Sequence, residues 1–324
     1  MMNSCAGKIW VDNYCNPVRV LKKKEKNNQN SIKKRRNIVS PKDIEDQLVL
    51  AIKRAETQLP DDVVSAIEKA HEIEEGSAKV QIEAILLNIK VSRETGAPMC
   101  QDTGIQTFFI EAGADFPYLG KLENIITDAV KRASSEVPLR PNTVNPFTGE
   151  NPGNNVGRYV PYITWDIVKG EECTIHLMPK GGGSENMCAL NMMSPGRGIK
   201  GLKRIVVDHI VSCEGKPCPP TVVGVGVGGG ADLSLKLGKR SLLRDVGVRH
   251  PEPHIAELEE ELLMLINESG VGPMGVGGKT TALDVHIEYA HRHPASFPIG
   301  IAVQCWADRR ATVKIKSDGT VEVI

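Results

Sequence analysis

The stretch PTVVGVGVGG, residues 220–229, is an unbroken and mostly apolar run in the second half of the chain. Its valines favour a strand, and a continuous apolar run is typical of a strand that is buried on both faces of a sheet. Within it, GVGVGG at 224–229 also satisfies G-x-G-x-x-G, and Asp245 follows about twenty residues on, as a dinucleotide-binding motif requires. Such a motif opens a βαβ unit, however, and a long helical region precedes it here. The stretch therefore predicts a buried strand of an α/β fold, with dinucleotide binding as an alternative.

A second glycine-rich stretch, GVGPMGVGGKTTALD at 270–284, has the look of a phosphate-binding loop. The consensus of that loop places a glycine five positions before Gly278, because backbone N–H groups must curl around phosphate oxygens. That position holds Pro273, which has no N–H, and Gly272 stands one residue too early. The pattern alone disfavours a nucleotide site and leaves the purpose of these glycines open.

The bulk composition excludes some classes of partner. Forty acidic and forty basic residues cancel, and the pI of about 7.1 gives no electrostatic reason to expect nucleic acid or a membrane surface. No apolar run approaches the roughly 20 residues that span a bilayer. The segment MMNSCAGKIWVDNYC lacks the apolar centre of a signal peptide. We therefore expect a soluble, cytoplasmic protein.

Residues 1–38 differ in composition from the rest of the chain. VLKKKEKNNQNSIKKRRN at 20–37 is basic, Asn-rich and poor in apolar residues, which predicts a disordered extension. A nucleic-acid-binding arm, a mitochondrial presequence and translated upstream sequence remain alternatives for it. We expect the folded domain to comprise residues 39–324.

From Ser40 onward the apolar spacing becomes helical. Ser40 is a predicted N-cap with Pro41 at the first helical position, and helices are expected at 43–59, 61–74 and 77–96, the last ending on Gly96. After Pro98 we expect helices at 123–137 and 254–270, and strands at 105–113, 172–179, 220–229, 298–306 and 311–324. This order predicts a mixed α/β fold, with a helical N-terminal lobe to about residue 98 followed by a lobe built on a mixed sheet.

Three of the eight cysteines stand at strand ends among polar residues or prolines. Cys100 lies in APMCQDTG, Cys218 in KPCPPT and Cys305 in VQCWADRR, whereas Cys173 and Cys188 lie in or beside apolar segments and suit a buried core. No C-x-x-C pair occurs, which argues against a zinc ribbon or a thioredoxin-type motif. The three thiols could converge on a soft metal or an iron–sulfur cluster. Three thiolates instead of four would leave one iron open for catalysis.

Six segments together resemble one enzyme family, the α subunits or N-terminal halves of class I iron–sulfur hydro-lyases. This family contains [4Fe-4S] fumarases and L-tartrate dehydratases. The similarity covers nearly everything from about residue 40 to the end, and residues 1–38 fall outside it. The segments are PMCQDTG, LRPNT, KGGGSENM, PCPPTVVGVGVGG, GPMGVGGKTTALDVH and HRHPASFPIGIAVQCWADRR.

The resemblance implies a role for nine residues. Cys100, Cys218 and Cys305 match the ligands of a [4Fe-4S] cluster. The match to substrate-binding and catalytic positions falls on six others: Gln101, Asp102, Arg140 as a carboxylate-binding arginine, Gly182 and Gly183 as backbone donors, and His293 as the active-site histidine. A dicarboxylate substrate requires such an arginine fork and backbone N–H groups. The resemblance also assigns the 270–284 glycines to close backbone approach, and no ATP is expected.

Each assignment has a simpler alternative. Arg140 could form a surface ion pair, and Asp102 could cap a turn. His286 or His291 could be confused with His293, and Lys180 could reach the substrate or merely neutralise a carboxylate.

The resemblance implies a hydro-lyase α subunit that adds water across the double bond of a small dicarboxylate. Fumarate hydration to L-malate is our first expectation, and dehydration of L-tartrate to oxaloacetate is the alternative. A nucleotide-dependent oxidoreductase and a cluster-bearing regulatory protein are alternatives from other classes. In single-chain relatives a further C-terminal region supplies more substrate-binding groups. We therefore expect a separate β subunit to complete the site in a hetero-oligomer.

Overall fold

The computed structural model describes residues 39–324, which belong to one compact unit. The predicted extension at 1–38 lies outside the described residues. The helices are α1 (Pro41–Thr57), α2 (Asp61–Ile73), α3 (Gly76–Thr95), α4 (Leu122–Glu136), α5 (Gly182–Glu185), α6 (Gly198–Cys213), α7 (Ala231–Ser241) and α8 (Pro253–Asn267). The strands are β1 (Ile105–Gly113), β2 (Tyr162–Val168), β3 (Cys173–Lys180), β4 (Ala189–Met193), β5 (Thr221–Gly229), β6 (Ala282–Arg292), β7 (Phe297–Gln304), β8 (Ala311–Ile315) and β9 (Val321–Val323).

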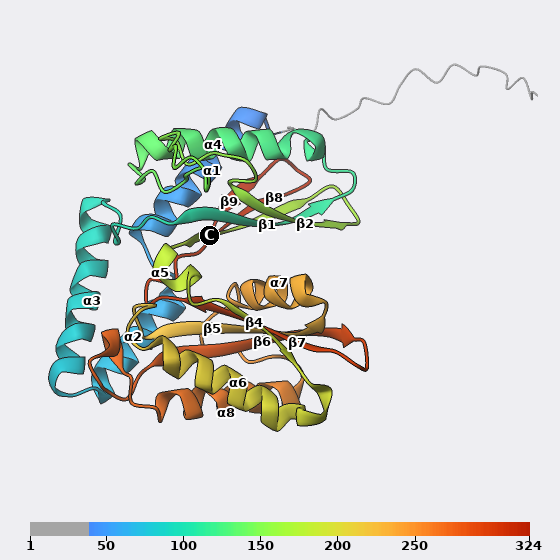
Figure 1. Ribbon diagram of the computed structural model, residues 1–324. Helices are drawn as coiled ribbons and strands as arrows, with labels where there is room; N and C mark the ends of the chain where they lie inside the picture. Colours follow the sequence, from blue (N-terminus) through green and yellow to red (C-terminus); the bar gives the residue numbers. More distant parts are fainter. Residues whose placement is uncertain (1–38) are drawn as a thin grey trace, which may run out of the picture. The chain divides into compact units, whose positions relative to one another are not determined.

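The strands form two mixed sheets that lie one above the other (Figure 1). The five-stranded sheet has the order β2-β1-β3-β8-β9, in which only the β1–β2 pair is parallel. The four-stranded sheet has the order β4-β7-β5-β6, in which only the β5–β6 pair is parallel. The predicted mixed α/β class, with helices before strands, is confirmed, although the strands divide between two sheets instead of one.

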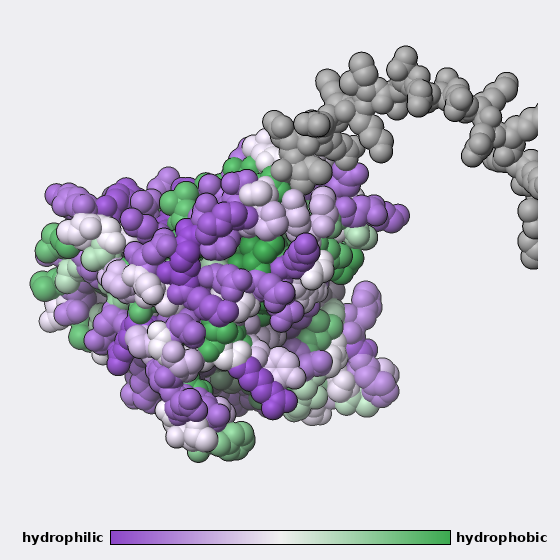
Figure 2. Space-filling view, turned by 90° about the horizontal axis from the view of Figure 1, so that it is seen from above, coloured by the Kyte–Doolittle hydropathy of each residue, from purple (hydrophilic) through white to green (hydrophobic). Residues whose placement is uncertain are grey.

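Helices cover the outer faces of both sheets. α1 and α4 pack on the five-stranded sheet, and α6 and α8 pack beneath the four-stranded sheet (Figure 1). The outer surface above the α1–α4 layer is mostly hydrophilic (Figure 2), as expected for amphipathic helices that bury one side. The predicted order of a helical N-terminal region followed by a sheet-based region is confirmed; within the former, α1 belongs to the layer of the five-stranded sheet, and α2 and α3 form another apolar cluster.

The predicted N-cap of α1 and the predicted C-cap of α3 are confirmed. The Ser40 hydroxyl accepts the Asp43 N–H, the Asp43 carboxylate accepts the Ser40 N–H, and Pro41 is the first helical residue of α1. α3 ends on Gly96, whose φ of 69° places it in the left-handed region. The strands β2, β4 and β6 and the helices α5, α6 and α7 were not predicted from the periodicity.

The valine–glycine run at 220–229 forms β5, which pairs with β6 and β7 in the middle of its sheet. Its glycines let helix α7 lie directly on the strand. A Cβ atom at Gly226 would stand 1.8 Å from the carbonyl oxygen of Ser234, and one at Gly224 would stand 2.1 Å from that of Gly238. The glycine pattern therefore serves the packing of a helix on a strand.

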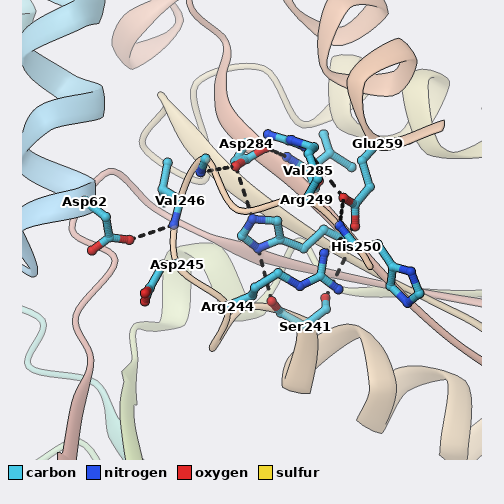
Figure 3. Close-up of polar contacts among 12 residues, drawn as sticks. Asp62, Ser241, Arg244, Asp245, Val246, Arg249, His250, Glu259, Asp284 and Val285 are labelled. Carbon is cyan, nitrogen blue, oxygen red and sulfur yellow. Dashed lines mark hydrogen bonds and ion pairs between the residues drawn. The ribbon is translucent and has the colours of Figure 1, made fainter. Parts of the chain in front are cut away.

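A network of buried charges fixes the connection between α7 and α8 (Figure 3). The fully buried Asp284 carboxylate pairs with Arg249 and accepts the Gly247 N–H at 2.6 Å. His286 lies between Asp284 and the Ser241 carbonyl, at 3.1 Å from each. The Glu259 carboxylate, also fully buried, accepts from Arg244 and from the backbone N–H of His250. Each buried charge thus has a partner of opposite sign, as burial requires.

The close approach of α7 to β5 leads to a test. We expect Gly226→Ala to lower the free energy of unfolding by about 1–3 kcal/mol or more, because the new methyl group collides with backbone atoms that cannot rotate away. The matched control is Gly120→Ala at an exposed turn where a Cβ meets nothing within 4 Å, with an expected change of about 0.5 kcal/mol or less. Urea unfolding of both variants measures the difference. Equal stability would contradict the packing role of Gly226.

Candidate active site

Three cysteines from distant parts of the chain lie against one apolar cluster. Cys100 stands in the loop between α3 and β1, Cys218 in the turn between α6 and β5, and Cys305 directly after β7. All three pack against the cluster that includes Met99 and Trp306. The backbone N–H of Trp306 donates to the carbonyl of Cys218 at 3.1 Å, which ties the second and third cysteine segments together.

Local backbone geometry places these thiols outside the regular elements. Cys218 has a φ of 56°, an uncommon conformation for a residue other than glycine, and it precedes the cis Pro219–Pro220 bond. Cys305 follows the last residue of β7, so its side chain leaves the row of the strand. By contrast, Cys173 lies inside β3 and is almost fully buried. The prediction that Cys173 is a buried core residue is therefore confirmed.

The electrostatics of the thiols favour a positively charged ligand. Burial raises the pKa of the Cys305 thiol to about 11, and burial together with the Cys100 thiol raises the pKa of Cys218. A thiolate at either position is therefore costly unless a metal or a cation compensates it. Arg309 supplies one such cation, since its guanidinium interacts with both Cys305 and Cys100.

The donor set fits an iron–sulfur cluster. Arg309 is fully buried, and its Nε has no hydrogen-bond partner in the described chain, so it remains available to a sulfur acceptor beside the thiols. Within residues 39–324 no three His, Cys, Asp or Glu side chains lie close enough to share one metal ion. A cluster does not require that, because each of its cysteines binds a different iron. Cys100, Cys218 and Cys305 are the residues that would hold it.

A cavity of about 650 Å³ lies beside this region and collects four of the predicted site residues. They are Gln101, Asp102, Arg140 and Gly182. The rest of the lining comprises Gly104, Ile105, Thr107, Asn142, Tyr159, Val160, Tyr162, Lys180, Glu185 and Lys239. The size and the mixture of polar and apolar groups suit a small organic acid.

Asp102 is held rigidly at the wall of this cavity. Its Oδ1 accepts the backbone N–H of Gly104 at 2.9 Å and the amide of Asn142 at 3.1 Å. Its Oδ2 accepts the backbone N–H of Gly182 at 2.7 Å. Asp102 therefore caps a turn, as the simpler alternative proposed, and it also faces the cavity. The Gly182 N–H is used by Asp102 in this arrangement.

Arg140 faces the cavity with an uncommitted side chain. Its backbone N–H donates to the Thr103 hydroxyl at 3.1 Å, which fixes the main chain. Within the described part of the chain, its guanidinium forms no ion pair or hydrogen bond, so the surface-ion-pair alternative is not realised in this structure. An exposed guanidinium at a cavity can form a fork with a carboxylate.

Lys180, which the sequence left undecided, is a buried cation in the cavity wall. Its ammonium donates to the Ser184 hydroxyl at 2.9 Å and to the Val303 carbonyl at 2.6 Å, and it lies 3.4 Å from the Glu185 carboxylate. Burial lowers its pKa. Because these three contacts use its three protons, Lys180 joins β3, α5 and β7, and it does not point a free charge at a substrate.

Lys239 and Asn142 are lining residues that sequence analysis missed. Lys239 lies on α7 and pairs with Glu185 at 2.5 Å, whereas Asn142 orients Asp102. Asn142 belongs to the LRPNT segment, which was quoted only for its arginine. Lys239 had no signal, since a lysine on an amphipathic helix is ordinarily a solvated surface residue.

Two predicted residues are not brought to the cavity. Gly183 is not among the lining residues. His293 is exposed in the turn between β6 and β7, where its Nδ1 accepts the backbone N–H of Ala295 at 3.1 Å. Cys305 lies at the other end of β7, and a strand of eight residues separates its ends by roughly 20 Å. Within one chain, His293 and the three thiols are therefore far apart.

The loop that looked like a phosphate site binds a carboxylate of the chain itself. The backbone N–H of Lys279 donates to both oxygens of Glu74, at 2.8 and 3.0 Å, and the N–H of Thr280 donates at 2.6 Å. Glu74 is buried, and a Cβ at Gly278 would stand 2.8 Å from its Oε2. These glycines serve close approach around Glu74, as expected.

Among the described helices, none is both long and apolar enough to cross a bilayer.

Comparisons with known proteins show the family of the chain. Residues 45–314 match the family model described as Fumarate hydratase (Fumerase). The chain is 48% identical over 280 residues to the "Putative L(+)-tartrate dehydratase subunit alpha" of Methanocaldococcus jannaschii, which covers 85% of this chain and 98% of that protein. It is 37% identical over 268 residues to the "L(+)-tartrate dehydratase subunit alpha" of Escherichia coli (strain UTI89), covering 82% and 88%. The protein of that name from strain K12 is 36% identical over the same length.

The class of protein follows from these matches together with the geometry: it is a hydro-lyase. More particularly, the chain belongs to the fumarate hydratase (Fumerase) family, and its predicted resemblance to class I hydro-lyase α subunits is confirmed.

Proposed function

We propose that this chain is the α subunit of a [4Fe-4S]-dependent L(+)-tartrate dehydratase, which removes water from L-tartrate to give oxaloacetate. The proposal rests on one observation: three thiols pack against one apolar cluster, beside a cavity that presents an unpaired arginine, Arg140. A dicarboxylate requires such a carboxylate fork, and removal of a hydroxyl requires an acid beside it.

The substrate differs from our first expectation. The relatives of highest coverage that we compared are named as L(+)-tartrate dehydratase α subunits, which favours tartrate over fumarate. Fumarate remains the second candidate because the matching family model is described as fumarate hydratase. The two reactions differ by one hydroxyl group on the substrate, a difference that a few polar side chains can decide.

The residues of this chain supply binding and orientation. The Arg140 guanidinium forks one carboxylate of the substrate, and Gln101 and the Asp102 carboxylate border the hydroxyl region. Asp102 keeps its position through three hydrogen bonds, so it can take or give a proton without moving. When bound by Cys100, Cys218 and Cys305, the cluster supplies an open iron that acts as a Lewis acid toward the departing hydroxyl.

His293 keeps its proposed catalytic role only across a subunit boundary. It lies at the opposite end of β7 from Cys305, so within its own chain it is too far from the cavity to contact a substrate. We infer that it acts in the site of a neighbouring subunit.

A β subunit is proposed as the partner that completes the site. The relatives that we compared are named as α subunits, and the resemblance implies further substrate-binding groups from a second chain. The cavity itself is open toward solvent at Gln101 and Arg140, and the segment between α4 and β2, which contributes to its lining, exposes Val144, Phe147 and Tyr159. Exposed apolar groups of this kind favour association.

Removal of a ligand thiol tests the cluster. Changing Cys100, Cys218 or Cys305 to Ser should abolish the broad brown absorbance of anaerobically reconstituted protein, because a hydroxyl is a poor ligand for iron in such a cluster. The same change at Cys173 or Cys188 should leave that absorbance in place. Equal loss from all five variants would refute the ligand assignment.

Arg140→Lys tests the carboxylate fork. The substitution keeps the charge but removes the bidentate geometry, so we expect KM to rise about tenfold or more while the cluster spectrum stays unchanged. Steady-state kinetics of the reconstituted enzyme measure this. A wild-type KM would remove Arg140 from the substrate site.

The reaction is tested by rates with several substrates. The α chain reconstituted with its β subunit should dehydrate L-tartrate faster than it hydrates fumarate or dehydrates L-malate, and the α chain alone should show little activity with any of them. Faster turnover of fumarate would favour the second candidate. Full activity of the α chain alone would refute the two-subunit proposal.

A further inference from the structure

The segment Met99–Asp102 carries both kinds of site residue. Cys100 is a proposed cluster ligand, and Gln101 and Asp102 border the substrate cavity. The segment lies outside any helix or strand, in the connection between α3 and β1. Irregular backbone is ordinarily among the more mobile parts of a protein. A site that depends on positions within a fraction of an ångström therefore needs something else to hold this segment.

Glu56, at the end of α1, holds the start of the segment. Its backbone carbonyl accepts the N–H of Met99 at 2.9 Å. Its side chain is fully buried, and its two oxygens accept from Gln106 at 3.1 Å and from Arg309 at 2.6 Å. A fully buried carboxylate this far from solvent is retained only with such partners.

Arg309 holds the end of the same segment. Its Nη1, besides donating to Glu56, donates to the carbonyl of Asp102 at 3.0 Å. Arg309 reaches this point from the far end of the chain, four residues after Cys305, and only 1% of the residue is exposed. Glu56 and Arg309 therefore bracket Cys100 and Gln101 from both sides.

We propose that Glu56 and Arg309 form a buried clamp that positions Met99–Asp102, so that Arg309 is a positioning residue for one cluster thiol and for the substrate-contacting Asp102. The clamp rests on the proposed function for the roles of Cys100 and Asp102. Its contacts do not depend on which dicarboxylate the enzyme uses. The unpaired Nε of Arg309 lies on the same guanidinium, so one side chain serves the loop and the sulfur site together.

The clamp makes a specific prediction about Arg309→Lys. Lysine keeps the positive charge, but a single ammonium cannot reproduce the rigid fork that meets Glu56 and Asp102. Loss of one buried, charged hydrogen bond should loosen the segment locally. We expect maleimide to label Cys100 about tenfold faster in the αβ complex from which iron has been removed by a chelator. Labelling of Cys218, located by peptide mass spectrometry, should stay within about twofold of wild type.

The matched control is Arg310→Lys at the next residue. The side chain of Arg310 is 8% exposed and also pairs with carboxylates, those of Asp62 at 2.5 Å, Asp245 at 3.1 Å and Asp308 at 3.2 Å, but no bond joins it to Met99–Asp102. Its loss should lower the melting temperature without accelerating Cys100 labelling. Glu56→Gln is the second test variant, which keeps the shape of the side chain and removes the charge. It should accelerate Cys100 labelling as Arg309→Lys does.

The reconstituted complexes give an independent readout. With the clamp loosened, kcat should fall at least about tenfold, because Asp102 loses its fixed position, while Arg310→Lys keeps most of its kcat. The clamp is overturned if Arg309→Lys and Glu56→Gln both label Cys100 at the wild-type rate, or if Cys218 labelling rises equally. Failure of tartrate as the substrate would leave the labelling result intact, so the two proposals can fail separately.

Discussion

The chain crosses between its two sheets through residues 305–310, and this buried crossing is the constraint on which the rest of the structure depends. It carries three consecutive charged residues: Asp308 and Arg309 are buried, and the side chain of Arg310 is 8% exposed. Because a buried charge requires a partner of opposite sign, Arg309 pairs with Glu56 of α1, and Arg310 pairs with Asp62 of α2. These two ion pairs hold α1 and α2 against the segment that connects β7 to β8.

The candidate active site lies where these contacts between the start and the end of the chain come together. Lys180 joins the end of β3 to the end of β7 across the two sheets, and the backbone of Trp306 reaches the Cys218 turn. The thiols and the cavity are therefore positioned by the seam between the sheets, with the thiols and Asp102 on irregular backbone and two of their supports, Glu56 and Lys180, on regular elements. That division suits a site that must hold a cofactor and still admit a small substrate.

Glycine in this protein serves packing between backbones. In β5 it makes room for α7, and at 275–278 it brings N–H groups around the Glu74 carboxylate. The stretch at 270–284 imitates a nucleotide motif because backbone N–H groups around a bare glycine turn suit an anion of any origin. The stretch in β5 imitates one because glycine also lets a helix pack directly on a strand. The spacing of glycines alone therefore does not identify what a glycine-rich stretch contacts.

The sequence by itself determined the mixed α/β class, the N-cap of α1, the C-cap of α3 and the position of three cysteines outside the strands, because local periodicity, capping chemistry and the residues around each thiol are properties of neighbours in the chain. It did not determine that the strands form two sheets, that β2, β4 and β6 exist, or that Lys180 and Lys239 line the cavity. Those depend on contacts between residues far apart in the chain, such as Lys180 with Val303 and Lys239 with Glu185. Only the tertiary structure could place His293 far from Cys305, because the eight residues of β7 lie extended between them.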